Sequence, residues 1–157
     1  MAELNVAVIG AGPAGLIAAE VLSRAGVAVT VYERMPSVGR KLLMAGRGGL
    51  NLTHSEPFAQ VVDRFGAASA RMRPMLEAFS PSNLTAWAEE LGQPTFIGSI
   101  GRIFPRALKA SPLLRAWLAR LADQGVSFRT HSTWRGWDAA GALGCHRMRR
   151  GARGSCG

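Results

Sequence analysis

The sequence LNVAVIGAGPAGLIAAEVLSRAGVAVTVYE, residues 4–33, decides the fold of this chain. It reads as an apolar strand, a glycine turn, a helix of small and aliphatic residues, and a second apolar strand. Short apolar runs of this kind are typical of buried parallel strands, which need a crossover helix between them. We therefore predict an α/β fold built on a Rossmann-like βαβ unit with a parallel sheet.

The glycine turn of this unit has the spacing Gly-x-Gly-x-x-Gly. Gly10 permits a tight turn, Gly12 leaves room for a pyrophosphate to approach the backbone, and Gly15 allows the helix to pack closely on the strand. Pro13 and Ala14 open the helix, whose free N–H groups and positive dipole end favour an anion. The turn is predicted to bind the phosphates of a dinucleotide, and the alternative is an ordinary tight connection between strand and helix.

A carboxylate stands at the end of the second strand. Glu33 follows Gly15 by close to the 20 residues expected for a group that accepts hydrogen bonds from an adenosine ribose. Its negative charge would repel the 2′-phosphate of NADP, which favours FAD as the dinucleotide.

The segment 34–56 is glycine-rich and basic, and is predicted to be a long functional loop. Arg40, Lys41 and Arg47 bring three cations to the place where the pyrophosphate is expected, and glycines such as Gly48 allow backbone to press against a flat ring. A solvated loop with incidental charge is the alternative. His54 is the one titratable group in this loop suited to catalysis, but a solvent-facing histidine is the preferred interpretation, and no catalytic residue is assigned.

The rest of the chain alternates helices and short strands. Apolar spacing predicts two amphipathic helices, one in 57–68 and one in 72–79, both packed in the core. Ser80 and Pro81 are typical of the start of a third helix, and 94–105 reads as a β-hairpin. A further amphipathic helix is predicted from Ser111, with Arg115 and Arg120 turned away from its apolar side, and a strand follows at 126–131.

Length and composition limit the function classes. With 157 residues and 48% hydrophobic content, the chain is expected to form one domain with a core but not a complete two-domain flavoenzyme. No stretch is long and apolar enough for a membrane span, and residues 1–25 lack a signal-peptide pattern, so a cytoplasmic protein without membrane contact is expected. Cys145 and Cys156 lie near the C-terminus and provide neither a metal-ligand spacing nor a disulfide framework.

Four segments together resemble a known family. They are the glycine turn Gly-Ala-Gly-Pro-Ala-Gly, Glu33-Arg34, Gly39-Arg40-Lys41-Leu-Leu with the following Gly-Arg-Gly-Gly-Leu-Asn-Leu-Thr, and Gly101-Arg-Ile-Phe-Pro with Lys109-Ala110-Ser111. The chain is similar here to bacterial FAD-dependent flavoproteins of the aminoacetone-oxidase-like and bile-acid dienoate reductase-like family. Many members have a cysteine where this chain has Leu50, so no role for a thiol is carried over.

The resemblance implies an FAD-binding oxidoreductase in which Arg40 and Lys41 meet the FAD phosphates and Asn51 lies near the flavin. In the full-length family NAD(P)H is a candidate electron donor and a small molecule is the substrate. Related flavoproteins place Thr133 and Trp134 near the adenine. The predicted cofactor-binding residues are Gly10, Gly12, Pro13, Ala14, Gly15, Glu33, Arg34, Arg40, Lys41, Gly48, Asn51, Leu52 and Trp134.

The last residues differ from the rest of the chain. The net charge is +9, and nearly half of this excess comes from arginines in 142–157. The resemblance covers about residues 4–141, and the segments that follow in family members have no counterpart in this sequence. We therefore expect an N-terminal FAD/NAD(P)-binding Rossmann-like domain in 1–141. Residues 142–157 are expected to be a disordered basic tail from a truncated or frameshifted gene, and the fold to be incomplete and without turnover alone. The alternative is a non-catalytic nucleotide- or RNA-binding module that uses the basic tail, although a nucleic-acid partner is not favoured.

Overall fold

The computed structural model describes residues 4–139 and 143–147, which fall into two compact units. The first unit combines the chain up to Leu42 with the chain from Leu118 onward, and the second comprises Leu43–Trp117. Helices α2 (Arg40–Ala45) and α6 (Ala110–Asp123) run across the boundaries between these segments. The predicted α/β fold with a parallel sheet is confirmed.

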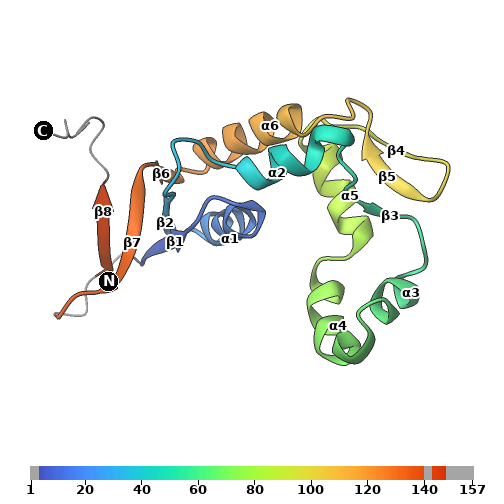
Figure 1. The fold of residues 1–157 in the computed structure, drawn as a ribbon, viewed down its shortest axis with the longest axis horizontal. Helices are drawn as coiled ribbons and strands as arrows, with labels where there is room; N and C mark the ends of the chain where they lie inside the picture. The colour runs from blue at the N-terminus through green and yellow to red at the C-terminus, as the bar shows by residue number, and fades with distance from the viewer. Residues whose placement is uncertain (1–3, 140–142, 148–157) are drawn as a thin grey trace, which may run out of the picture. The chain divides into compact units, whose positions relative to one another are not determined.

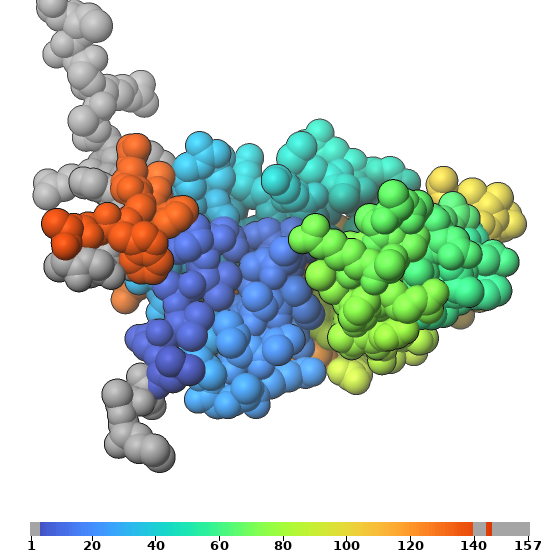
Figure 2. All heavy atoms as spheres, turned by 90° about the horizontal axis from the view of Figure 1, so that it is seen from below, coloured from blue at the N-terminus to red at the C-terminus, as the bar shows by residue number. Residues whose placement is uncertain are grey.

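The first unit contains the βαβ element. Strand β1 (Asn5–Ile9), helix α1 (Pro13–Arg24), strand β2 (Ala28–Tyr32) and strand β6 (Ser127–Arg129) form it, with the parallel order β1-β2-β6. Figure 1 shows the strands beside α1, and Figure 2 shows the blue atoms of β1 and α1 lying against one another. Because the strands are parallel, the chain segments that follow β1, β2 and β6 all leave from the same edge of the sheet.

Close packing of α1 on β1 depends on Gly15. A Cβ atom at this position would overlap the carbonyl oxygen of Gly10 and lie 3.3 Å from a methyl group of Val8. The next residue, Leu16, and Ala19 one turn further on are fully buried. The sequence-based role of Gly15 in helix packing is therefore confirmed.

A buried ion pair joins α1 to α6. The Glu20 side chain is 1% exposed, and its Oε1 lies 3.1 Å from Arg24 and 3.2 Å from Arg120. The prediction that Arg120 turns away from the packed side of its helix is wrong, because its guanidinium neutralises a carboxylate that would be costly to bury alone. Ser23 donates a hydrogen bond to Gln124 (2.9 Å) and reinforces the same contact.

The C-terminal part of the first unit is a β-hairpin. Strand β7 (Ser132–Trp137) pairs antiparallel with β8 (Leu143–Arg147), with Trp134 opposite Cys145 and an irregularity between Trp134 and Trp137. The expectation of disorder from residue 142 is thus wrong for 143–147, because backbone pairing with β7 orders a strand without any apolar periodicity. Residues 142 and 148–157 lie outside the described part of the chain.

The second unit is mostly helical and has a small antiparallel sheet in the order β3-β5-β4. Its elements after α2 are η1 (Gly46–Gly48), β3 (Thr53–His54), α3 (Phe58–Asp63), η2 (Gly66–Ala68), α4 (Ser69–Ala78), α5 (Pro81–Glu90), β4 (Thr95–Ile97), β5 (Arg102–Pro105) and the first part of α6. The rings of Trp87 and Trp117 pack edge to face in its core, with their centroids 4.7 Å apart. Ser80 caps α5 in a reciprocal capping box with Asn83, as the sequence indicated.

Two local predictions for the second unit need correction. Helices α3 and α4 form, and α3 contributes Val62 to the core as predicted, but α4 is not a core element, and its Met75 is 58% exposed. Pro74 lies inside α4, which has no buried residue. The segment 34–56 is also not one continuous loop, because α2, η1 and β3 form within it. Short elements of this kind are fixed by tertiary hydrogen bonds, such as Leu52 N–H to the Ile103 carbonyl (2.8 Å), which no local pattern reveals.

We expect Gly15→Ala to destabilise the chain by about 1–3 kcal/mol, because the added methyl group must displace the backbone of Gly10. Chemical denaturation monitored by circular dichroism measures this change. Gly12→Ala is the matched control, since nothing lies within 4 Å of a Cβ atom there and the added methyl group displaces no backbone, so its cost should be limited to the lower preference for Ala at an N-cap and should be smaller than that of Gly15→Ala. Equal stability of the two variants would contradict the packing role of Gly15.

Candidate functional site

The glycine turn presents an unblocked helix start. Gly10 has a φ of +98°, which favours glycine, and its N–H donates to the Tyr32 carbonyl at 2.8 Å. Gly12 is the N-cap residue of α1 and Pro13 follows at the first position, with no side chain capping the helix. The N–H groups of the first turn therefore remain available to an anion.

Gly12 is not required by packing within the chain. Its φ is −81°, which any residue can adopt, and no atom lies within 4 Å of the position that a Cβ atom would take. The open space lies beside the N–H groups that begin α1. Packing therefore leaves space where a side chain at position 12 would lie, and the approach of a pyrophosphate to this space stays a prediction.

Glu33 is tied to the glycine turn. Its Oε2 accepts a hydrogen bond from the Ala11 N–H at 2.8 Å, and its Oε1 accepts one from the Met35 N–H at 2.7 Å. Each carboxylate oxygen has a second lone pair, so the group can still accept hydrogen bonds from ribose hydroxyls. Sequence spacing indicated the ribose role but not the two backbone contacts.

The start of α2 is hydrogen-bonded to the same residue, Ala11. The Gly39 N–H donates to the Ala11 carbonyl at 2.8 Å, so both polar groups of the buried Ala11 are used. Arg40 and Lys41 follow directly and are exposed. The hydrogen bond holds the backbone next to these two cations against the glycine turn, where an anionic ligand would meet positive charge from both α1 and α2.

The other predicted residues of the first unit lie around this edge of the sheet. Ala14 and Arg34 are exposed. The Ser132 N–H donates to the Glu33 carbonyl at 2.9 Å, so β7 begins beside the end of β2. Trp134 lies two residues further along β7 and is 45% exposed. Its contact with adenine stays a prediction.

Gly48, Asn51 and Leu52 belong to the second unit. Gly48 ends η1 with no atom near its Cβ position, and Asn51 is exposed. Leu52 is held by its N–H bond to Ile103. Their role beside the flavin stays a prediction.

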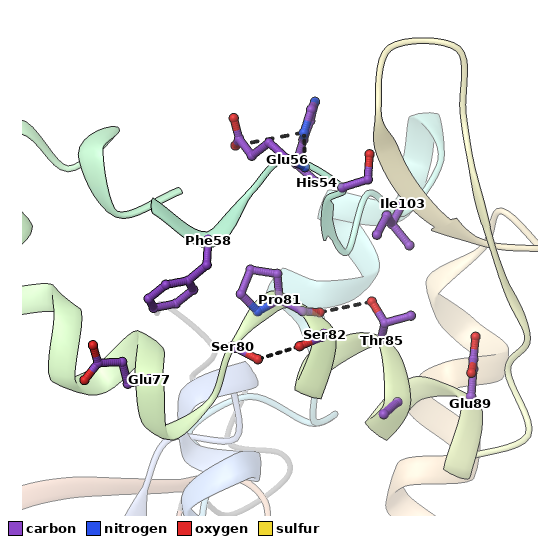
Figure 3. Close-up of a pocket in the computed structure, with 12 residues that line it drawn as sticks. His54, Glu56, Phe58, Glu77, Ser80, Pro81, Ser82, Thr85, Glu89 and Ile103 are labelled. Carbon is purple, nitrogen blue, oxygen red and sulfur yellow. Dashed lines mark hydrogen bonds and ion pairs between the residues drawn. The ribbon is translucent and has the colours of Figure 1, made fainter. Parts of the chain in front are cut away.

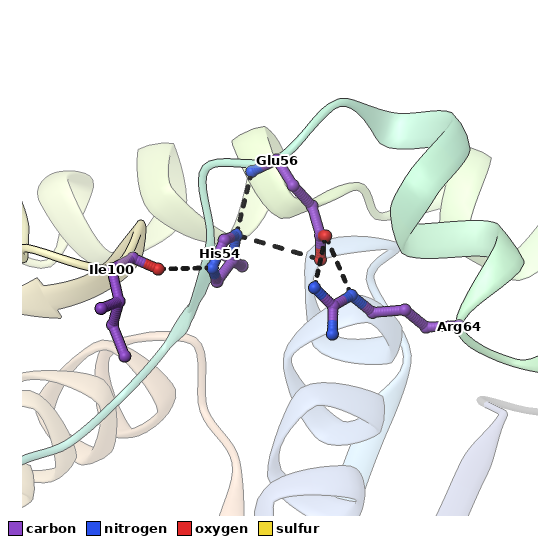
Figure 4. Close-up of polar contacts among 4 residues, drawn as sticks. All are labelled: His54, Glu56, Arg64 and Ile100. Atoms are coloured by element: carbon purple, nitrogen blue, oxygen red, sulfur yellow. Dashed lines mark hydrogen bonds and ion pairs between the residues drawn. The ribbon is translucent and has the colours of Figure 1, made fainter.

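His54, expected to face solvent, lies in β3 and has a side chain that is 35% exposed, but both of its ring nitrogens have hydrogen-bond partners. Its Nε2 lies 2.8 Å from the Ile100 carbonyl, and its Nδ1 accepts from the Glu56 N–H at 3.1 Å, which makes Nε2 the donor in the neutral ring (Figure 4). Glu56 in turn receives two hydrogen bonds from Arg64, at 2.9 and 2.7 Å, and raises the pKa of that guanidinium by hydrogen bonding and by charge. His54 therefore connects β3 to the turn between β4 and β5.

The arrangement in the first unit suits binding rather than acid–base chemistry. It provides backbone N–H groups, one carboxylate and two nearby cations. Within residues 4–139 and 143–147 there is no group of three or more His, Cys, Asp or Glu side chains able to hold a metal ion. None of the helices in these same segments is long and apolar enough to cross a membrane.

Comparison with known proteins agrees with this arrangement. The family model of the HI0933-like protein Rossmann domain matches residues 4–152, which extends beyond the limit of about 141 expected from the sequence. Thiamine thiazole synthase of Pyrococcus horikoshii is 34% identical over 64 residues, covering 41% of this chain and 25% of that protein. Ribosomal RNA dihydrouridine synthase of Haemophilus influenzae is 47% identical over 49 residues, covering 31% of this chain and 12% of that protein.

Solved structures support the fold. A flavocytochrome c3 fumarate reductase in its open conformation superposes with a TM-score of 0.64 at 21% identity, over 87% of this chain and 28% of that one. The aligned region thus spans well under half of each of these proteins.

We expect Gly12→Val to abolish FAD binding while the secondary structure is retained, because the branched side chain would occupy the space beside the start of α1. A fluorescence titration with FAD and a circular dichroism spectrum measure the two properties. Retained FAD affinity in the folded variant would contradict the phosphate-binding role of the turn.

We expect Glu33→Gln to weaken FAD binding by about tenfold or more. Glutamine has one acceptor oxygen where Glu33 uses two, and a hydrogen bond to a charged group contributes about 1.5–3 kcal/mol. Asp123→Asn is the control, since this exposed residue precedes the opposite, amino-terminal edge of the sheet. Unchanged FAD affinity in Glu33→Gln would refute the role of the carboxylate.

Proposed function

The chain belongs to the HI0933-like Rossmann-domain family, and we propose that its glycine turn, Glu33 and the start of α2 hold the ADP half of FAD. It is an FAD-binding domain of an oxidoreductase-type flavoprotein. When bound, FAD supplies two-electron redox chemistry. The contribution of this chain is to bind and orient the cofactor and to set the charge around its phosphates.

The observation that carries the proposal is the convergence on Ala11. Its N–H contacts the Glu33 carboxylate and its carbonyl contacts the N–H of Gly39, so one residue fixes the ribose acceptor and the approach to Arg40 and Lys41. Pro13, the first residue of α1, has no N–H, so the free N–H groups of the helix begin at Ala14, three residues after Ala11. Groups suited to a ribose and to two phosphates are thus connected through Ala11, which supports the proposal that an ADP moiety binds here.

The likeness to aminoacetone-oxidase-like and bile-acid dienoate reductase-like flavoproteins supports a finer proposal. On this basis the complete protein passes electrons between NAD(P)H and a small organic substrate, with Asn51, Leu52 and the backbone of Gly48 beside the flavin ring. Glycine at position 48 leaves no side chain between the backbone and a flat ligand. The proposed cofactor domain reaches at least to the end of β7 at Trp137.

Structured RNA is a second candidate substrate. Two observations favour it: the net charge of +9, and the segment that is 47% identical to a ribosomal RNA dihydrouridine synthase. Phosphate contacts by Lys and Arg make binding strongly dependent on salt. RNA affinity that falls steeply between low and physiological salt would favour this substrate class over a small molecule.

We expect the purified chain to bind FAD in preference to FMN, because FMN lacks the ADP half that the first unit recognises. ADP alone should compete with FAD. The measurements are the flavin absorption of the purified protein, chromatography of the extracted cofactor, and displacement of FAD by ADP. Equal affinity for FMN, or no competition by ADP, would overturn the proposed site.

A further inference from the structure

The second unit contains a groove that plays no part in the proposed FAD site. Its volume is about 790 Å³, and its walls come from β3 and the following loop, the ends of α3 and α4, helix α5 and β5 (Figure 3). Every residue that lines it lies within Leu43–Trp117. The groove is therefore a property of that unit alone.

The charge of this groove is opposite to that of the chain. The net charge is +9, but the described residues that line the groove include no Lys or Arg, whereas Glu56, Glu77 and Glu89 are among them. Glu56 is 8% exposed and is neutralised by Arg64 at 2.7 Å. Glu77 and Glu89 are exposed, so two carboxylates give the lining its net negative charge.

The two exposed carboxylates stand at opposite ends of the groove. Figure 3 shows Glu77 on the side of Phe58 and Ser80, and Glu89 beyond Thr85 at the other end of α5. Glu89 follows Ser80 by nine positions, which is about 13 Å along a helix that rises 1.5 Å per residue. A ligand that meets both carboxylates must be elongated.

Between these ends the lining combines apolar side chains with hydroxyl groups, and the hydroxyls of Ser80, Ser82 and Thr85 already make hydrogen bonds within the chain. Phe58, Pro81, Ala86 and Ile103 provide the apolar surface. The Thr85 hydroxyl donates to the Pro81 carbonyl at 3.0 Å within the helix. These side chains offer a hydrophobic middle to a ligand rather than a row of free polar groups.

Each of the two carboxylates has a polar contact within the chain and can still accept further hydrogen bonds. Oε1 of Glu89 accepts a hydrogen bond from the Thr95 hydroxyl at 2.7 Å, which orients the carboxylate and leaves lone pairs for a cationic ligand. Glu77 lies 3.8 Å from Arg73, an exposed pair at a distance where the interaction is weak. On the wall opposite α5, the contacts of His54 with Ile100 and Glu56 fix the β3 segment (Figure 4).

We propose that this groove binds an elongated organic dication, with an amine at each end and an apolar chain between them. The ammonium groups pair with Glu77 and Glu89, and the chain lies over Phe58, Pro81 and Ile103. None of the residues that line the groove is among those proposed to bind FAD.

The test is a calorimetric or NMR titration of the full chain with 1,8-diaminooctane, compared with octylamine and 1,8-octanediol. We expect the diamine to bind more tightly than the monoamine and the neutral diol to bind most weakly. Added salt should weaken binding of the diamine, because both contacts are exposed ion pairs. Equal binding of the diol, or no saturable binding of the diamine, would overturn the proposal.

Variants test the two carboxylates separately. Glu77→Gln and Glu89→Gln should each weaken diamine binding by roughly two- to fivefold, the range for exposed ion pairs, and reduce the advantage of the diamine over octylamine. The amide of E89Q retains an oxygen for the Thr95 hydroxyl, so folding should be preserved in this variant. Asp63→Asn removes the same charge from an exposed position of α3 that does not line the groove. An equal effect of D63N would show that net charge, not the groove, governs binding and would refute the proposal.

Discussion

The backbone polar groups of Ala11 make the contacts on which the proposed cofactor site depends. The N–H bonds to Glu33 at the end of β2 and the carbonyl bonds to Gly39 before α2. Three segments separated along the chain are thereby fixed at one edge of the parallel sheet. Because Ala11 is 1% exposed, either polar group would be costly to leave without a partner. The same bonds that satisfy the buried backbone also hold the Glu33 carboxylate and the backbone next to Arg40 and Lys41.

Packing elsewhere in the first unit keeps this edge in place. Gly15 lets α1 lie close to β1, and the ion pairs of buried Glu20 with Arg24 and Arg120 connect α1 to the last part of α6. Helix α6 leads through a short turn into β6, which pairs with β2. The orientation of α1, and with it the direction of its free N–H groups, is therefore supported from both ends of the unit.

The two units differ in their chemistry. The edge of the first presents N–H groups and cations, as an anionic cofactor requires, whereas the groove of the second is lined by carboxylates and apolar side chains. In a chain with a net charge of +9, such a groove attracts a different class of ligand. His54, a candidate for catalysis on sequence grounds, stabilises a wall of this groove through both ring nitrogens.

The sequence by itself determined the βαβ element, the FAD-binding class and the capping of α5, because these depend on local periodicity, glycine conformation and short spacings. Only the tertiary structure decided the contacts of Ala11, the pairing of Arg120 with Glu20, and the strand at Leu143–Arg147. Glu20 and Arg120 are 100 residues apart, and each alone is typical of a solvated helix face. The exposure of α4 was likewise not predicted from the sequence. Apolar spacing indicates that a helix forms, but not which other elements pack against it. Contacts of this range depend on how elements pack, and no local pattern encodes them.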